Sequence, residues 1–212
     1  TYTGATSVNA GTVIVANNNA LGSVVGDTTV ASGASLDLQN AAVGAEQVTL
    51  SGSTLLASTG TSSLSGNVVM GGNSVIDIAG NELTLSGRIS GVTYGFTKQG
   101  AGRLVLSATN IYTGATQINA GTIVVSNVGN LGGNNANLIM ATGTTLDLQN
   151  ALTLGSLSMA GTASITNTAG TSSLTVNGPS LIASLVKTNG NQTYLGDVEL
   201  ANSAVIESLG GN

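Results

Sequence analysis

The side chains that could do chemistry in this 212-residue chain are mostly carboxylates: nine Asp and Glu residues against four Lys and Arg, with no His and no Cys. Glycoside hydrolysis requires a pair of carboxylates, and Asp77, Glu82 and Asp37 are the candidates for one. The chain has no Trp and no cluster of Tyr residues on which a sugar could stack. We therefore interpret these acids as solvent-facing charges that keep the protein soluble and discourage lateral pairing of sheets.

Nucleophilic catalysis has even less support. A serine triad needs a base, and no His is present. A Ser–Lys pair could use Lys98 or Lys187, but neither Lys lies in a recognisable serine motif. The missing Cys removes disulfides, thiolate metal sites and Cys nucleophiles together. We predict that the chain is not an enzyme and has no catalytic residue.

The only stretch with a metal-binding pattern is residues 71–76, Gly-Gly-Asn-Ser-Val-Ile, which begin like a calcium-binding nonapeptide repeat. That repeat needs Gly at its fourth position and Asp at its sixth, where this chain has Ser74 and Ile76. We predict no dedicated metal site and no cofactor.

Composition limits the class of protein and its partners. Charged residues make up 6% and aromatic residues 2% of the chain, while 41% is apolar, so a folded protein with a thin aliphatic core is expected rather than a disordered one. The four basic residues are scattered along an acidic chain, so we predict no nucleic-acid partner. No run of eighteen apolar residues occurs, and we predict no membrane insertion.

The second half of the sequence repeats the first in a fixed register. Residues 2–6, Tyr-Thr-Gly-Ala-Thr, return as residues 112–116, and residues 36–41, Leu-Asp-Leu-Gln-Asn-Ala, return as residues 146–151. We expect one β-helical unit over residues 1–212, made of a module of about 110 residues used twice (1–110 and 111–212), with the second copy irregular at its C-terminal end. The chain opens within the repeat and shows no signal peptide, so we expect it to be a piece of a longer protein.

Within the module, short apolar triplets recur about every 15–21 residues, as a solenoid requires, and a second set of strands lies between them. No helical periodicity is visible. Short strands bent at Gly and Asn corners, at this spacing, predict coils whose strands stack in parallel ladders. The predicted fold class is all-β, a right-handed parallel β-helix (a β-solenoid) of roughly ten coils.

Alternation predicts which side chains face inward. In residues 36–38 and 146–148, Leu-Asp-Leu, the leucines share one face, so we expect Asp37 and Asp147 to point to solvent. Tyr2, Tyr112 and Tyr194 recur at equivalent positions, and we interpret them as braces at a corner of the coil.

Residues 98–127 are the most densely patterned stretch. Nine residues in fixed spacing give this stretch its motif: Lys98, Gly100, Gly102, Leu104, Leu106, Asn110, Tyr112, Gly114 and Thr116. This motif resembles the passenger-associated transport repeat of bacterial autotransporters, which are large type V secreted surface proteins. Residues 1–40 hold a partial copy, and residues around Lys187 hold a shortened one.

The resemblance implies an extracellular or cell-surface location and export through the outer membrane by a type V route. We predict a structural and adhesive β-helical stalk segment with a repetitive binding face. Its partner would be a host-cell, surface or matrix ligand, or a second copy of itself. Two alternatives stay open: a self-assembling extracellular matrix or filament protein, and a polysaccharide-processing enzyme on the same scaffold.

Overall fold

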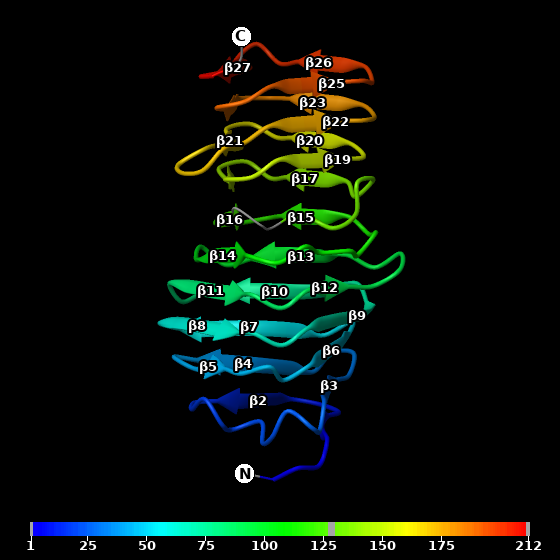
Figure 1. Ribbon diagram of the computed structural model, residues 1–212, viewed down its shortest axis with the longest axis vertical. Helices are drawn as coiled ribbons and strands as arrows, with labels where there is room; N and C mark the ends of the chain where they lie inside the picture. The colour runs from blue at the N-terminus through cyan, green and yellow to red at the C-terminus, as the bar shows by residue number, and fades with distance from the viewer. Residues whose placement is uncertain (1, 127–129, 211–212) are drawn as a thin grey trace.

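The computed structural model describes residues 2–126 and 130–210, and all regular structure in these residues is β-strand. Thr1, where the N-terminal repeat copy begins, and Asn127, where the densely patterned stretch ends, lie outside the described residues. The strands form four parallel sheets, named here by their numbers of strands. The coils are stacked one above another from the N-terminal to the C-terminal end (Figure 1).

Each sheet takes one strand from every coil that it crosses. The five-stranded sheet contains β1 (Thr6–Val8), β3 (Thr28–Val30), β6 (Val48–Ser51), β9 (Val68–Gly72) and β12 (Ile89–Ser90). The ten-stranded sheet contains β2 (Thr12–Val15), β4 (Ser35–Gln39), β7 (Thr54–Thr59), β10 (Ser74–Ile78), β13 (Phe96–Gln99), β15 (Thr116–Ile118), β17 (Leu138–Met140), β20 (Leu157–Met159), β23 (Ser180–Ile182) and β26 (Val198–Leu200).

The other two sheets complete the coils. The nine-stranded sheet contains β5 (Ala42–Val43), β8 (Thr61–Leu64), β11 (Glu82–Leu85), β14 (Arg103–Leu106), β16 (Thr122–Val125), β18 (Thr145–Leu148), β21 (Ser164–Thr166), β24 (Leu185–Thr188) and β27 (Val205–Ser208). The three-stranded sheet contains β19 (Leu152–Leu154), β22 (Leu174–Val176) and β25 (Gln192–Tyr194). It precedes the ten-stranded sheet in chain order, as the five-stranded sheet does in the earlier coils.

The predicted fold class, an all-β parallel β-helix of roughly ten coils, is confirmed. The predicted spacing of about 15–21 residues per coil overlaps the observed one, although the apolar triplets on which it rested lie in different sheets. Within a single ladder the step along the sequence varies: Thr12 pairs with Ser35, a longer step than predicted, whereas Ser180 pairs with Val198, a step within the predicted range. The corners between strands accommodate most of this variation in length, and the β4–β7 and β6–β9 pairs each contain one register shift.

The core is a narrow column of aliphatic side chains that alternate along each strand with outward ones. In β10 the burial alternates along the whole strand, with Ile76 and Ile78 inside and Val75 and Asp77 half-buried on the outer side. Phe96 and Tyr112 supply the one ring contact found in the described residues, edge to face with centroids 5.5 Å apart.

Strands that correspond in sequence do not lie in the same sheet. β4 belongs to the ten-stranded sheet, whereas β18, which repeats its sequence in the second module, belongs to the nine-stranded sheet. The same shift by one sheet separates β1 from β15 and β2 from β16. Leu36 and Leu146 are nevertheless both fully buried. The second module therefore begins five coils after the first and one sheet further around the coil.

Candidate functional site

The prediction that Asp37 points to solvent is wrong. Its side chain is 4% exposed, although it lies on the outer side of β4. Its Oδ1 accepts the backbone N–H of Ser58 at 3.0 Å, and its Oδ2 accepts the Ser58 hydroxyl at 2.8 Å and Gln39 Nε2 at 2.7 Å. The neighbouring Gln and the Ser of the next coil cover the carboxylate, which alternation along a single strand cannot reveal.

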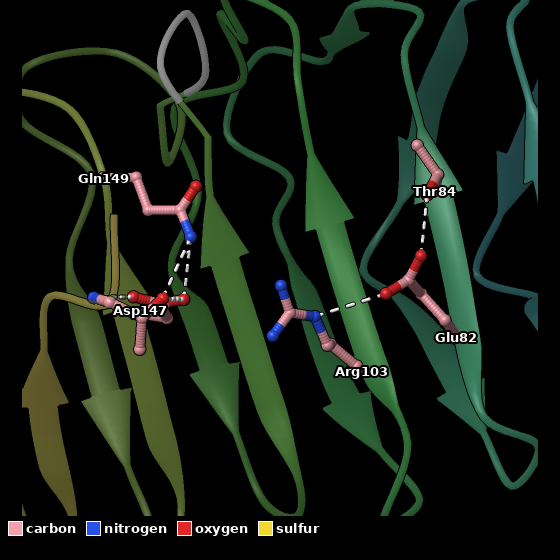
Figure 2. A network of polar contacts seen from close by, with 6 residues as sticks. Glu82, Thr84, Arg103, Asp147 and Gln149 are labelled. Atoms are coloured by element: carbon pink, nitrogen blue, oxygen red, sulfur yellow. Dashed lines mark hydrogen bonds and ion pairs between the residues drawn. The ribbon is translucent and has the colours of Figure 1, made fainter. Parts of the chain in front are cut away.

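The same correction applies to Asp147, which is 2% exposed. Its Oδ1 accepts the Thr168 N–H at 3.0 Å, and its Oδ2 accepts the Thr168 hydroxyl at 2.6 Å and Gln149 Nε2 at 2.8 Å. Figure 2 shows Gln149 and Asp147 directed toward each other. We call each set of three residues an Asp clamp: Asp37, Gln39 and Ser58, or Asp147, Gln149 and Thr168. Each clamp fastens one coil to the next.

The remaining candidate acids are spread over two sheets. Asp77 lies in β10 of the ten-stranded sheet, whereas Glu82 lies in β11 of the nine-stranded sheet. Asp37 and Asp77 share one ladder, but Leu56 lies between them, paired with both. Glu82 forms an ion pair with Arg103 of the next coil at 3.2 Å (Figure 2). The structure therefore does not bring the three candidates of the sequence analysis together.

Glu46 is a buried acid that no sequence pattern singles out. It is 3% exposed, and its Oε1 accepts the hydroxyl of the fully buried Thr28 at 2.7 Å. Burial raises the pKa of Glu46, the bond from Thr28 acts in the opposite direction, and the nearby charge of Asp27 adds to the rise. A single Glu between Ala45 and Gln47, with no repeated copy, gives no signal that predicts burial.

The two lysines considered for a Ser–Lys pair are both engaged elsewhere. Lys187 forms an ion pair with Glu207 at 3.5 Å. Lys98 is fully buried, and its Nζ donates to the backbone carbonyls of Gln99 and Gly100, both at 2.7 Å, and of Ala120 at 3.2 Å. Burial lowers the pKa of Lys98 to about 8, against the opposing effect of the negative charge of Asp77. Its ammonium group therefore bridges the corners of two successive coils.

The glycines that follow Lys98 in the motif are required by close backbone approach. A Cβ at Gly102 would lie 2.4 Å from the carbonyl oxygen of Gly80 in the preceding coil. Gly100 has a positive φ of 72°, and a Cβ there would lie 2.2 Å from the Ile78 oxygen. The Lys-x-Gly-x-Gly spacing thus forms a corner against which the preceding coil can pack.

The second half of the motif joins coils as well. Asn110, 1% exposed, accepts the Ile89 N–H through Oδ1 at 2.7 Å and donates through Nδ2 to the Asn130 carbonyl at 2.8 Å. The hydroxyls of Tyr112 and Thr116 are hydrogen-bonded to each other, and burial raises the pKa of Tyr112.

The role proposed for the tyrosines as corner braces fits Tyr2 and Tyr112, whereas Tyr194 lies in β25 and donates its hydroxyl to Gln192 Oε1 of the same strand at 2.9 Å. Tyr2 and Thr6 repeat the bond between Tyr112 and Thr116 in the first coil. Because a β-carbon at Gly132 would lie 2.5 Å from the Tyr112 carbonyl oxygen, the corner after Tyr112 also packs closely on the next coil.

The stretch that begins like a calcium-binding repeat serves as a corner between β9 and β10. Ser74 Oγ accepts the Gly52 N–H at 3.1 Å and lies 3.1 Å from the Gly72 carbonyl, to which it donates. Within residues 2–126 and 130–210, no three His, Cys, Asp or Glu side chains gather as they would around a metal ion.

Comparison with known proteins agrees with this geometry. A model of the Passenger-associated-transport-repeat family matches residues 1–15, the beginning of the N-terminal partial copy, and residues 96–125, which hold the nine-residue motif. The chain carries autotransporter passenger repeats. The resemblance predicted from the motif is thereby confirmed.

The passenger repeats also connect the chain to a larger relative. Over 138 residues it is 34% identical to the Adhesin BmaC autotransporter of Brucella suis biovar 1 (strain 1330), an alignment that covers 58% of this chain and 4% of that protein. The chain thus spans a small part of the length of the relative that it matches. No solved structure matches the chain significantly.

The relation to autotransporter passengers implies an extracellular or cell-surface location for the repeat-bearing chain. No helix of membrane-spanning length and apolarity is found in the described part of the chain.

Proposed function

We propose that this chain is a structural and adhesive stalk segment of a secreted bacterial surface protein, which provides reach and a repeated binding face. The observation that carries the proposal is the use of the motif: Lys98, Asn110 and Tyr112 are all buried in bonds or packing between coils. The most conspicuous side chains therefore build the rod, and the outward ladders of the sheets remain available for contacts.

Stacked coils also suit export by a type V route, which the resemblance implies. Each coil contacts mainly its neighbours, so stability is approximately a sum of nearest-neighbour terms and folding can propagate from one end. A chain that leaves the outer membrane gradually could then fold coil by coil outside the cell. Many weak contacts along the rod would together bind tightly, because each contact that forms raises the effective concentration of the ligand at the next.

The adhesive proposal is tested by coupling the 212-residue chain to beads and measuring bead retention, under flow, on surfaces coated with extracellular matrix or host-cell membranes. We expect retention that increases steeply with the density of chains on the bead, as multivalent weak binding requires. Retention equal to that of beads coated with an unrelated β-solenoid would overturn the adhesive part of the proposal.

Self-assembly is the second candidate, because corners along the rod expose apolar side chains. Val25 is 80% exposed, Val92 78% and Val24 61%. Exposed apolar surface of this kind can pack against another chain. Sedimentation velocity over a range of concentrations tests this candidate: a sedimentation coefficient that rises with concentration supports it, and a constant monomer value contradicts it.

A further inference from the structure

The corner that leads into the five-stranded sheet is built almost entirely of glycines. Two residues before each strand of this sheet the chain has, in order, Gly4, Gly26, Glu46, Gly66 and Gly87. A Cβ at Gly26 would lie 2.3 Å from the carbonyl oxygen of Gly4 in the preceding coil. Successive coils therefore approach closely at this corner, and Glu46 brings a long ionisable side chain to a position that is otherwise Gly.

Glu46 directs its carboxyl group into the protein. The residue is 3% exposed, and its Oε1 accepts the hydroxyl of Thr28, in the preceding coil, at 2.7 Å. Thr28 is fully buried, and the residues that follow it in the same ladder are the fully buried Val48 and Val68. The carboxyl group is thus bonded to a hydroxyl at the margin of the aliphatic column.

The nearest charge that acts on this carboxyl group has the same sign. Asp27 lies beside Thr28 in the sequence, and its Oδ2 accepts Gln47 Nε2 at 2.8 Å. Within residues 2–126 and 130–210, the ion pairs involve other acids, Glu82 and Glu207. The corner therefore holds Glu46 without a compensating cation.

The other segments around the corner add few titratable groups. Residues 20–26, 41–45 and 62–67 contain none. The first coil contributes Tyr2, whose hydroxyl is bonded to that of Thr6, and the carbonyl of Arg88, two coils beyond Glu46, accepts the Val68 N–H. The protonation of this corner near neutral pH thus depends mainly on Glu46.

Burial without a cation favours the neutral form of a carboxyl group. The Thr28 hydroxyl can donate to a carboxylate and can accept from a protonated carboxyl group, so it serves both forms. Burial and the charge of Asp27 accordingly raise the pKa of Glu46 above its ordinary value of 4.5, against the bond from Thr28. Above that value the folded chain binds more protons than the unfolded one, so the stability of the corner falls as the pH rises toward the folded pKa.

We propose that Glu46 and Thr28 form an acid-stabilised latch at this corner, which we call the corner latch. With Glu46 protonated, the corner stays closed and β3 and β6 stay paired. With Glu46 ionised, the carboxylate is drawn toward water, and these two strands open more often. The opening is local, because each coil is held mainly by its neighbours. The corner latch goes beyond the adhesive proposal and does not depend on it, since it regulates the rod and binds no ligand.

The test is amide hydrogen exchange of the 212-residue chain between pH 4 and pH 8, with each rate divided by the rate expected for an unfolded chain at the same pH. In the parent, the amides of β3 and β6 should lose protection several-fold as the pH rises. The amides of β20, which lies far from the corner in the ten-stranded sheet, should keep theirs.

Four variants separate the corner latch from a general effect of pH. Glu46→Gln removes the titration, and Glu46→Gly restores the glycine of the ladder, so both should keep β3 and β6 equally protected at every pH. Thr28→Val removes the donor that serves the carboxylate and matches the valine of the next coil, so it should enlarge the loss. Glu82→Gln, at a half-buried acid paired with Arg103, is the matched control and should keep the profile of the parent.

Three outcomes would overturn the inference: constant protection of β3 and β6 in the parent, an equal loss in β20, or a loss that persists in both Glu46 variants. None of these outcomes bears on bead retention, so the adhesive proposal can fail or stand separately.

Discussion

At the scale of single residues, the polar side chains of this protein act mainly on backbone groups of neighbouring coils. Asp37 and Asp147 accept N–H groups one coil further on, and Lys98 donates to carbonyls in two coils. A buried charge is tolerated when its hydrogen-bonding capacity is filled. Asp37 and Lys98, two of the residues that first suggest catalysis, therefore help to hold successive coils together.

Asp147→Asn should lower the free energy of unfolding by about 1–3 kcal/mol, because the amide nitrogen cannot accept the bonds from Gln149 and the Thr168 hydroxyl that Oδ2 accepts. Urea unfolding of the 212-residue chain measures the change. Glu199→Gln, at an exposed acid of the ten-stranded sheet, is the control and should have little effect. Equal midpoints for the two variants would show that the Asp clamp contributes nothing.

Lys98→Met should change how stability depends on pH. Burial lowers the folded pKa of Lys98 to about 8 from an ordinary value of 10.5, so between these values the unfolded chain binds more protons and stability rises with pH. The Met variant should lose this rise. It should also be less stable by about 1–3 kcal/mol at pH 7, since the carbonyls of Gln99, Gly100 and Ala120 lose their donor.

The measurement for Lys98 is the thermal midpoint of the parent and the variant between pH 7 and pH 10. Taking the difference between the two profiles removes the contribution of the tyrosines, which both proteins share. A difference that stays constant across this range would contradict the proposed burial of a charged ammonium group.

At the scale of the elements, alternation and corner residues predicted the strands well because both are local. The leucines of residues 36–38 and 146–148 are buried as expected. The exposure of the aspartates between them was predicted wrongly, because their partners lie in the next coil. The strands that stack were not predicted for a related reason: similar apolar triplets occur in every sheet, and the sequence does not say which ones pair.

We propose that residues 1–110 and 111–212 are two copies of one module, as the repeated sequences predict. Both copies hold an Asp clamp and a Tyr–Thr pair. Since corresponding strands lie one sheet apart, the second copy would present its outward residues on a different side of the rod. A tandem array of such modules would then distribute any one binding face around its axis.

Gly102→Ala tests the close packing of the corners. The added Cβ would lie 2.4 Å from the Gly80 oxygen, so the corner must shift and we expect a loss of about 2 kcal/mol or more. Gly44→Ala is the matched control, because a Cβ at Gly44 meets nothing within 4 Å. Chemical denaturation of both variants should separate them clearly; equal stability would mean that the corner is open at Gly102.

At the scale of the whole molecule, ten strands at about 4.8 Å per step give a rod about 50 Å long. Ion pairs on the nine-stranded sheet also run from coil to coil, between Glu82 and Arg103 and between Lys187 and Glu207. Exposed pairs of this kind contribute little to stability. The rod is held mainly by its aliphatic column and by bonds between successive coils.

The central claim, that successive coils stack in parallel at the described register, is tested most directly by disulfide cross-linking in a chain that has no Cys of its own. Gln117 and Ile139 are paired across one coil step, and adjacent strands are about 4.8 Å apart, within reach of a disulfide. Ser158 lies one step beyond Ile139. Oxidation should cross-link the pair Gln117→Cys with Ile139→Cys rapidly, and the pair Gln117→Cys with Ser158→Cys hardly at all. Efficient cross-linking of the second pair, or none of the first, would contradict the stacked solenoid.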